Sequence, residues 1–185
     1  MIARANAHIT YPARFQLVAA MNPCRCGYMD DPERSCGRVP RCAQEYQSKI
    51  SGPLLDRIDL NVFVPVVKPH ELQRAPMGES SKDVGERVLA ARAIQNKRFQ
   101  ESTDNTQKIF LNAHATGQLL ESMATPDAEG QALMLKAAEK FKLSTRGYHR
   151  ILRVARTIAD LEHSPNIRNS HIAEAIAFRQ LGGSV

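Results

Sequence analysis

The sequence is poor in aromatic residues: tryptophan is absent, and phenylalanine and tyrosine make up 5% of its 185 residues. Stacking of nucleic-acid bases on aromatic rings is therefore a poor candidate for its main binding mode. No apolar run approaches the roughly 18 residues that a membrane-spanning helix needs. Met1 to Arg4 lead into a polar stretch without the apolar segment of a signal peptide. These absences predict a cytoplasmic protein without a membrane span.

The composition is otherwise that of a globular protein, with 43% hydrophobic and 24% charged residues. The length allows one ordinary domain or two small ones. The formal net charge is +6 at pH 7, which favours a polyanionic partner such as DNA.

The first part of the chain, residues 1–68, carries two apolar runs that are typical of buried strands. Residues 15–21 stop at Asn22-Pro23, and residues 60–64 stop at a proline. Continuous apolar runs between turn residues suit strands of a parallel sheet. Because two strands do not make a stable sheet, we expect an incomplete α/β domain whose other strands lie elsewhere.

The second part of the chain has helical periodicity. It predicts an all-α domain over residues 83–185, separated from the first part by a linker at 69–82. The expected helices cover residues 83–101, 111–122 and 126–141, then a stretch capped by Ser144 or Thr145, and finally residues 170–181.

Arg57 stands between Asp56 and Asp59, just ahead of the second apolar run. The guanidinium of arginine is always charged, and its planar fork fits phosphate oxygens. An arginine that is presented at the end of an element suits a phosphate on a neighbouring subunit. The alternative is an ordinary surface ion pair with one of the two aspartates.

Two further residues are candidates for contact with a phosphate. Asn22 ends the first apolar run, and the carboxyl ends of sheet strands are where ligands bind; its alternative role is to form a turn before proline. Arg146 begins a capped helix, whose amino terminus favours anions. The alternative for Arg146 is a solvated charge in a basic stripe with Arg150 and Arg153.

All four cysteines of the chain fall within 19 residues, at Cys24, Cys26, Cys36 and Cys42. Four thiolates in one loop suit a tetrahedral structural zinc site. The spacing C-x-C-x9-C-x5-C differs from the paired C-x2-C of common zinc fingers. Free thiols and a redox role therefore stay open as alternatives.

The amino-terminal stretch contains Arg4, Asn6 and His8, three polar residues ahead of Tyr11. They are candidates for one arm of a hairpin that touches nucleic acid. A frayed terminus is the alternative.

Three stretches resemble the magnesium-chelatase-like AAA+ ATPases and, among these, the bacterial competence-type proteins. They are RFQLVAAMNPC at residues 14–24, SGPLLDRIDL at 51–60 and LSTRGYHRILRVARTIADL at 143–161. The resemblance covers essentially the whole chain. It implies the second half of a P-loop AAA+ core over residues 1–68 and the helical lid of the family over 83–185.

The resemblance also implies roles for the candidate residues in a ring, expected to be a homohexamer, that uses ATP and Mg²⁺. Asn22 resembles sensor 1, which helps to place the attacking water. Arg57 resembles the arginine finger, which reaches the γ-phosphate of ATP on the next subunit. Arg146 resembles sensor 2 on the lid. Residues 4–11 resemble the end of a hairpin that in related motors faces a central pore and DNA.

One family motif is missing from the sequence. No G-x-x-x-x-G-K-[ST] is present to cradle phosphates and hold the Mg²⁺ ligand hydroxyl, and the acidic strand end for Mg²⁺ is missing too. Phosphoryl transfer needs all these parts together. We therefore expect a carboxyl-terminal piece of a longer protein, inactive as an ATPase by itself. Two other functions stay open: a chelatase subunit for magnesium insertion, and a zinc-supported nucleic-acid-binding module.

Overall fold

The structure of this chain is a computed structural model that describes residues 2–4, 7–11, 15–29, 31, 33–67, 71, 78–101 and 111–179. The chain divides into two compact units, Met1–Lys49 and Ile50–Val185. Among the described helices, none is long and apolar enough to cross a membrane. The predicted linker at 69–82 falls mostly outside the described residues.

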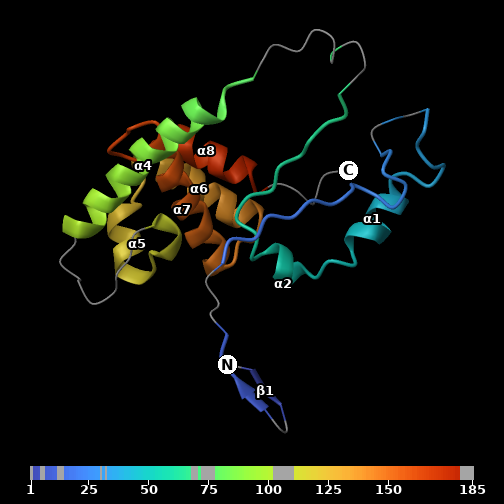
Figure 1. The fold of residues 1–185 in the computed structure, drawn as a ribbon, viewed down its shortest axis with the longest axis horizontal. Coiled ribbons are helices and arrows are strands. Elements are labelled where there is room, and N and C mark those ends of the chain that lie inside the picture. The colour runs from blue at the N-terminus through green and yellow to red at the C-terminus, as the bar shows by residue number, and fades with distance from the viewer. Residues whose placement is uncertain are drawn as a thin grey trace. The chain divides into compact units, whose positions relative to one another are not determined.

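The first unit begins with a two-stranded hairpin of β1 (Ile2–Arg4) and β2 (Ala7–Ile9), visible in Figure 1. The strands are antiparallel, and Ala3 pairs with His8. A loop that contains the four cysteines follows later and leads into the short helix α1 (Arg41–Gln47).

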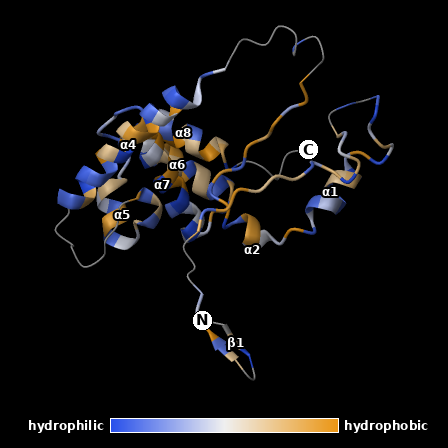
Figure 2. Cartoon of the chain, viewed as in Figure 1, coloured by the Kyte–Doolittle hydropathy of each residue, from blue (hydrophilic) through white to orange (hydrophobic). Residues whose placement is uncertain are grey.

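The two strands predicted for a parallel sheet are absent from the described chain, which corrects the sequence analysis. Residues 15–21 and 60–64 carry no strand pairing, and β1–β2 is the sheet that the described residues contain. Apolar side chains in both stretches are exposed, such as Val18 at 86% and Val64 at 79%, and the stretches stand out as orange in Figure 2. A parallel strand forms only beside hydrogen-bonded neighbours, and the described residues supply none. The described chain is thus rich in helices with one small sheet, and it shows no P-loop core.

The second unit is helical. Its elements are α2 (Gly52–Leu55), α4 (Ser81–Glu101), the 3₁₀ turn η1 (Asn112–His114), α5 (Gly117–Met123), α6 (Ala128–Lys140), α7 (Thr145–Leu161) and α8 (Asn169–Ala177). Helix α7 packs against α4, α5, α8 and η1, and α6 packs against α8. The most deeply buried apolar side chains of this core include Leu120, Met134, Ile167 and Ile172.

Side-chain caps fix where α6 and α7 begin. The carboxylate of Asp127 accepts a hydrogen bond from the amide of Gly130 at 2.7 Å. The hydroxyl of Ser144 accepts one from the amide of Gly147 at 3.0 Å, which confirms the cap predicted for α7. Each cap satisfies an amide that the first helical turn leaves without a partner.

The predicted helix over residues 111–122 is in fact two pieces. The backbone at Ala115 and Thr116 is extended, with ψ of 132° and 162°, and separates η1 from α5. Gly117 then takes a positive φ of 56°, which a residue without a Cβ adopts at little cost.

A buried ionic network joins the helices of this unit. Asp160 on α7 is fully buried and pairs with Arg98 of α4 and with Arg156 of α7, the latter at 3.0 Å. Its other oxygen accepts a hydrogen bond from the side-chain amide of Asn112 in η1 at 2.8 Å. Burial lowers the pKa of Arg156 from its usual value. Every partner of Asp160 is a donor, so both oxygens of this buried carboxylate are hydrogen-bonded.

Candidate phosphate-binding site and candidate metal centre

A short turn of helix presents Arg57. Helix α2 begins after the extended residue Ser51, carries Pro53 near its start and gives way to a turn at Asp56. The amide of Arg57 donates to the carbonyl of Leu54 at 3.0 Å. The Arg57 side chain reaches back over α2, and its Nη1 donates to the carbonyl of Pro53 at 2.8 Å. Arg57 itself is exposed.

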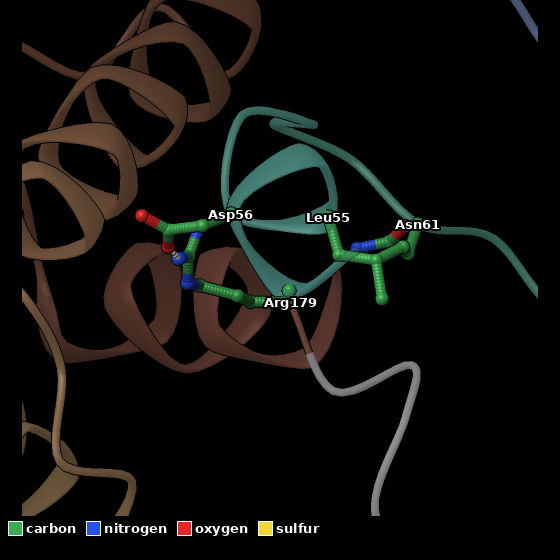
Figure 3. A pocket seen from close by; sticks show the side chains of 5 residues that line it. Leu55, Asp56, Asn61 and Arg179 are labelled. Atoms are coloured by element: carbon green, nitrogen blue, oxygen red, sulfur yellow. Dashed lines mark hydrogen bonds and ion pairs between the residues drawn. The ribbon is translucent and has the colours of Figure 1, made fainter. Parts of the chain in front are cut away.

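The two aspartates beside Arg57 pair with other arginines. Asp56 forms an ion pair with Arg179, which follows α8, and the two side chains face each other in Figure 3. Asp59 forms an ion pair with Arg150 of α7, with 2.8 Å between Nη1 and Oδ1. The alternative role of Arg57, a surface ion pair with Asp56 or Asp59, is therefore not found, since both aspartates pair with other arginines.

Arg57 and Arg146 line one hollow of about 390 Å³ within the second unit. Pro53, Asp56 and Arg150 complete its lining. Arg146 is the second residue of α7, so the positive end of that helix lies at the same place. The lining thus contains three arginines and one carboxylate, that of Asp56, which is itself paired with Arg179. The hollow is therefore suited to an anion.

A second hollow, of about 220 Å³, lies beside the first and is shown in Figure 3. It is lined by Gly52, Leu55, Asp56, Asn61 and Arg179. Arg179, the arginine in this lining, is already paired with Asp56. This hollow is therefore less suited to binding an anion than the first hollow is. The amide of Asn61 donates to the carbonyl of Phe178 at 2.8 Å and joins this segment to the end of α8.

The structure divides the basic stripe that the sequence places on α7. Arg146 is exposed and lines the larger hollow, whereas Arg150 binds Asp59. Arg153 is partly buried, its Nη1 lies 3.3 Å from the carbonyl of Ala115, and burial lowers its pKa from the usual value. The spacing places these three arginines on one stripe of α7, but each has a different environment.

Asn22 belongs to the first unit, whereas Arg57 and Arg146 belong to the second. Asn22 is exposed, and its side-chain amide lies near Gly27. The described residues bring Arg57 and Arg146 together, and the sensor 1 role of Asn22 stays a prediction.

Three of the four cysteines come together in the first unit. The sulfur atoms of Cys24, Cys26 and Cys42 all lie within 4.8 Å of one another. The two sulfurs nearest in sequence, of Cys24 and Cys26, are 3.0 Å apart, and none of the cysteines forms a disulfide. Thiolate sulfurs at this spacing are able to surround one metal ion. Metal binding by these three sulfurs is a proposal.

Two contacts hold the cysteine loop in this shape. The amide of Gly27 donates to the carbonyl of Cys24 at 3.2 Å, and Gly27 has a φ of 83° that closes the turn. The side-chain amide of Gln47 on α1 donates to the carbonyl of Pro23 at 2.9 Å, so the helix that carries Cys42 is fixed to the turn that carries Cys24.

The neighbouring thiols polarise one another. The hydrogen bond from the Cys24 thiol, followed by backbone hydrogen bonds, lowers the pKa of Cys26 to about 6. The same hydrogen bond and burial raise the pKa of Cys24. A hydrogen bond with the Cys36 thiol also favours the Cys26 thiolate, although Cys36 is not one of the three grouped sulfurs.

Three arginines in and beside the cysteine loop form ion pairs with nearby acidic residues. Arg38 and Arg41 both pair with Glu45, at 2.9 Å and 3.3 Å. Arg34 pairs with Asp31 at 3.5 Å. The pKa of Cys26 is lowered by its hydrogen bonds with the Cys24 thiol and with backbone groups.

The amino-terminal hairpin contains both candidate residues that the structure describes. Arg4 and His8 are exposed, and Asn6 lies outside the described residues. Because Ala3 pairs with His8 and Arg4 pairs with Ala7, Arg4 and His8 project from opposite faces of the ribbon. A single flat surface would not contact both residues.

Two family models match the chain one after the other. The model described as "Magnesium chelatase, subunit ChlI" matches residues 1–72, and "Magnesium chelatase, subunit ChlI C-terminal" matches residues 78–179. The chain therefore belongs to the magnesium chelatase subunit ChlI family. Within the family it falls in the subgroup of the proteins named ComM and YifB.

Relatives of this subgroup align with nearly the whole chain. "Competence protein ComM" of Haemophilus influenzae is 39% identical over 182 residues, which cover 98% of this chain and 34% of that protein. "Uncharacterized protein YifB" of Escherichia coli is 39% identical, over 97% of this chain and 34% of its own length. YifB of Salmonella typhimurium is 36% identical with the same coverage. The chain thus spans about a third of the length of these relatives.

Proposed function

We propose that the chain is the part of a ring-forming AAA+ ATPase that presents two arginines to the phosphates of a nucleotide, and that the whole protein acts on DNA. The observation that carries this proposal is that Arg57 and Arg146, 89 positions apart in the sequence, line one hollow. The family assignment supports ATP and Mg²⁺ as its cofactors.

Arg57 suits the arginine finger of such a motor. Its side chain is exposed, and the carboxylates next to it pair with Arg150 and Arg179 instead. Nη1 of Arg57 donates to the carbonyl of Pro53, but a guanidinium has five donors, binds phosphate oxygens strongly and adds no proton step to the reaction. In related phosphoryl transfers such an arginine is worth roughly 10³–10⁵ in rate.

Arg146 suits the second phosphate contact. It lies in the first turn of α7, where the unpaired amides and the helix dipole favour negative charge. Since Arg57 and Arg146 share one hollow, we propose that they bind oxygens of the same polyphosphate. The hollow is large enough for a phosphate group but offers little apolar surface for a base.

Two observations favour DNA over a tetrapyrrole pathway. The net charge of +6 suits a polyanion. The H. influenzae relative is named a competence protein, although the family models carry the magnesium chelatase name. The exposed hairpin with Arg4 and His8, together with Asn6, is the proposed DNA contact. In the longer protein, ATPase activity stimulated by DNA rather than by a porphyrin-binding partner would decide between the two pathways.

We further propose that the cysteine cluster holds one structural Zn²⁺. Cys24, Cys26 and Cys42 supply three ligands, and the nearby Cys36 supplies the fourth. Four thiolates without an open position suit a structural role and not a catalytic one. Such a site would stabilise the first unit, in which Cys24 and Ala43 are the buried apolar side chains among the described residues.

Binding of inorganic tripolyphosphate to the 185-residue chain, measured by calorimetry, tests the phosphate site. Arg57→Ala and Arg146→Ala should each weaken binding roughly tenfold or more, because each removes a charge-assisted hydrogen bond. Arg92→Ala, on an exposed face of α4, is the matched control and should leave affinity unchanged. Equal affinity for all four proteins would exclude the hollow as the site.

A further inference from the structure

Five contacts fasten the segment around Arg57 to the helices α7 and α8 and to the residues that flank them. Arg150 of α7 donates to the main-chain carbonyl of Arg57 and to the carboxylate of Asp59, the latter at 2.8 Å. On the other side of the segment, Asp56 pairs with Arg179. The list of contacts is completed by a 3.4 Å hydrogen bond from Ser144 to Asp56 and the 2.8 Å bond between Asn61 and Phe178.

Arg150 is the contact that acts on Arg57 itself. Its side chain is 20% exposed, whereas Arg57 and Arg146 are both exposed residues. It lies four residues after Arg146, so the two side chains project from the same face of α7. One guanidinium thus touches the backbone of Arg57 and lies one helical turn from Arg146.

We propose that Arg150 is the positioning residue of this phosphate site. By holding the carbonyl of Arg57, with Asp59 as its counter-ion, it fixes the backbone of Arg57 relative to α7. The Arg57 and Arg146 side chains are then already in place to face one polyphosphate, so binding does not have to order them. This inference rests on the proposed phosphate site and adds a residue that acts through Arg57.

Asp59 allows a test that separates positioning from charge. If Arg150 were only one more positive charge, Asp59→Asn would remove a nearby negative charge and tighten the binding of tripolyphosphate. If Arg150 positions Arg57, Asp59→Asn weakens binding although the site becomes more positive, because Arg150 loses its counter-ion. The two roles thus predict opposite changes in the same measurement.

The experiment compares the wild-type chain with Asp59→Asn, Arg150→Gln and Arg150→Lys. We expect a loss of roughly threefold to tenfold in tripolyphosphate affinity for Asp59→Asn and Arg150→Gln. Lysine keeps the charge but not the planar fork, so Arg150→Lys should not restore binding fully. Each variant should keep its thermal midpoint within about 3 °C, since the ion pair is largely exposed at Asp59.

Amide hydrogen exchange gives a second measurement that needs no ligand. The amides of Arg57 and Asn61 are hydrogen-bonded, so exchange there should be faster in Arg150→Gln than in the wild type. Unchanged exchange, or tighter phosphate binding in Asp59→Asn, would overturn the positioning role. If the wild type binds no tripolyphosphate, the proposed phosphate site fails, while faster exchange would still establish that Arg150 holds the segment.

Discussion

Asp56 pairs with Arg179, which lies 123 residues further along the chain, and not with its neighbour Arg57. The guanidinium of Arg179 lies close to Gly147 in the first turn of α7. A Cβ atom at position 147 would lie 3.0 Å from Nη2 of Arg179, closer than nearly all real contacts of this kind. Gly147 therefore leaves the space in which the ion pair forms.

Gly147→Ala should gain little or no stability in the wild-type background. Alanine improves helix propensity by about 1 kcal/mol, but its methyl group pushes Arg179 away from Asp56. In an Arg179→Ala background the added methyl group no longer displaces an ion-pair partner. The same substitution should then stabilise the protein by about 1 kcal/mol. Urea unfolding of the four proteins of this cycle measures the difference.

Gly85→Ala is the matched control for that cycle, because a Cβ at Gly85 in α4 meets nothing within 4 Å. It should stabilise by roughly 0.5–1 kcal/mol whether or not Arg179 is present. If Gly147→Ala had an equal effect in both backgrounds, the coupling between Gly147 and Arg179 would be refuted.

Asp160→Asn should destabilise the second unit by roughly 3–5 kcal/mol, because it leaves Arg98 and Arg156 without their shared buried carboxylate. Chemical unfolding followed by far-UV circular dichroism measures this loss. Glu86→Gln removes the exposed partner of Lys82 at 4.0 Å and should cost less than about 0.5 kcal/mol. Similar losses for the two variants would contradict the importance of the buried network.

Glu162→Gln should change how stability depends on pH. The imidazole of His171 donates from Nε2 to Glu162, while its Nδ1 accepts from the amide of Arg168 at 2.9 Å. The hydrogen bond from His171, aided by the charge of Arg168, lowers the pKa of Glu162 below its usual 4.5. A lowered carboxyl pKa adds stability above the unfolded value that is lost as pH falls through the folded one.

The wild type should therefore exceed Glu162→Gln in unfolding free energy at pH 6, and the difference should shrink as the pH falls below about 4.5. Denaturant unfolding at a series of pH values measures it. Glu174→Gln on α8 is the control, because the described residues give its side chain no ion pair. A difference that stays constant down to pH 3 would count against the assignment.

Elemental analysis of the purified chain should find one zinc per molecule if the cysteine cluster is a metal site. Removal of the metal with a chelator should then lower the thermal stability of the first unit. Cys24→Ser and Cys42→Ser should both reduce the bound zinc, and Cys36→Ser tests the fourth ligand. A metal-free sample with unchanged stability would end the zinc proposal.

Helices were the part of the fold that the sequence predicted well. Ala155 and Ile151 of α7 are buried as their spacing predicts, and Ser144 caps the helix. In α4, Val84 and Val88 have the spacing of core residues in an amphipathic helix, yet both are exposed, and burial begins further along at Ala91. Local sequence patterns predict helices because the hydrogen bonds of a helix are local. How many other elements pack against a helix cannot be predicted from the sequence of that helix alone.

The candidate sites were predicted to different degrees. The resemblance selected Arg57 and Arg146, and the structure places both at one hollow. The sequence offered no signal that Arg179 pairs with Asp56, or that Arg150 binds the carbonyl of Arg57. The sequence shows that the four cysteines lie close together in the chain, but it does not indicate which three sulfurs come together. Pairings between distant residues depend on how the elements pack.

The sequence by itself determined the family, the helices of the second unit and the residues that are able to carry charge or bind metal. These properties follow from residue type and short spacing, which need no knowledge of packing. Only the tertiary structure decided that the two apolar runs form no strands in the described chain. It also decided that Asp56 and Asp59 pair with Arg179 and Arg150 instead of with Arg57. Strand pairing and ion pairing are contacts between residues far apart in the chain, so their partners exist only once the chain has folded.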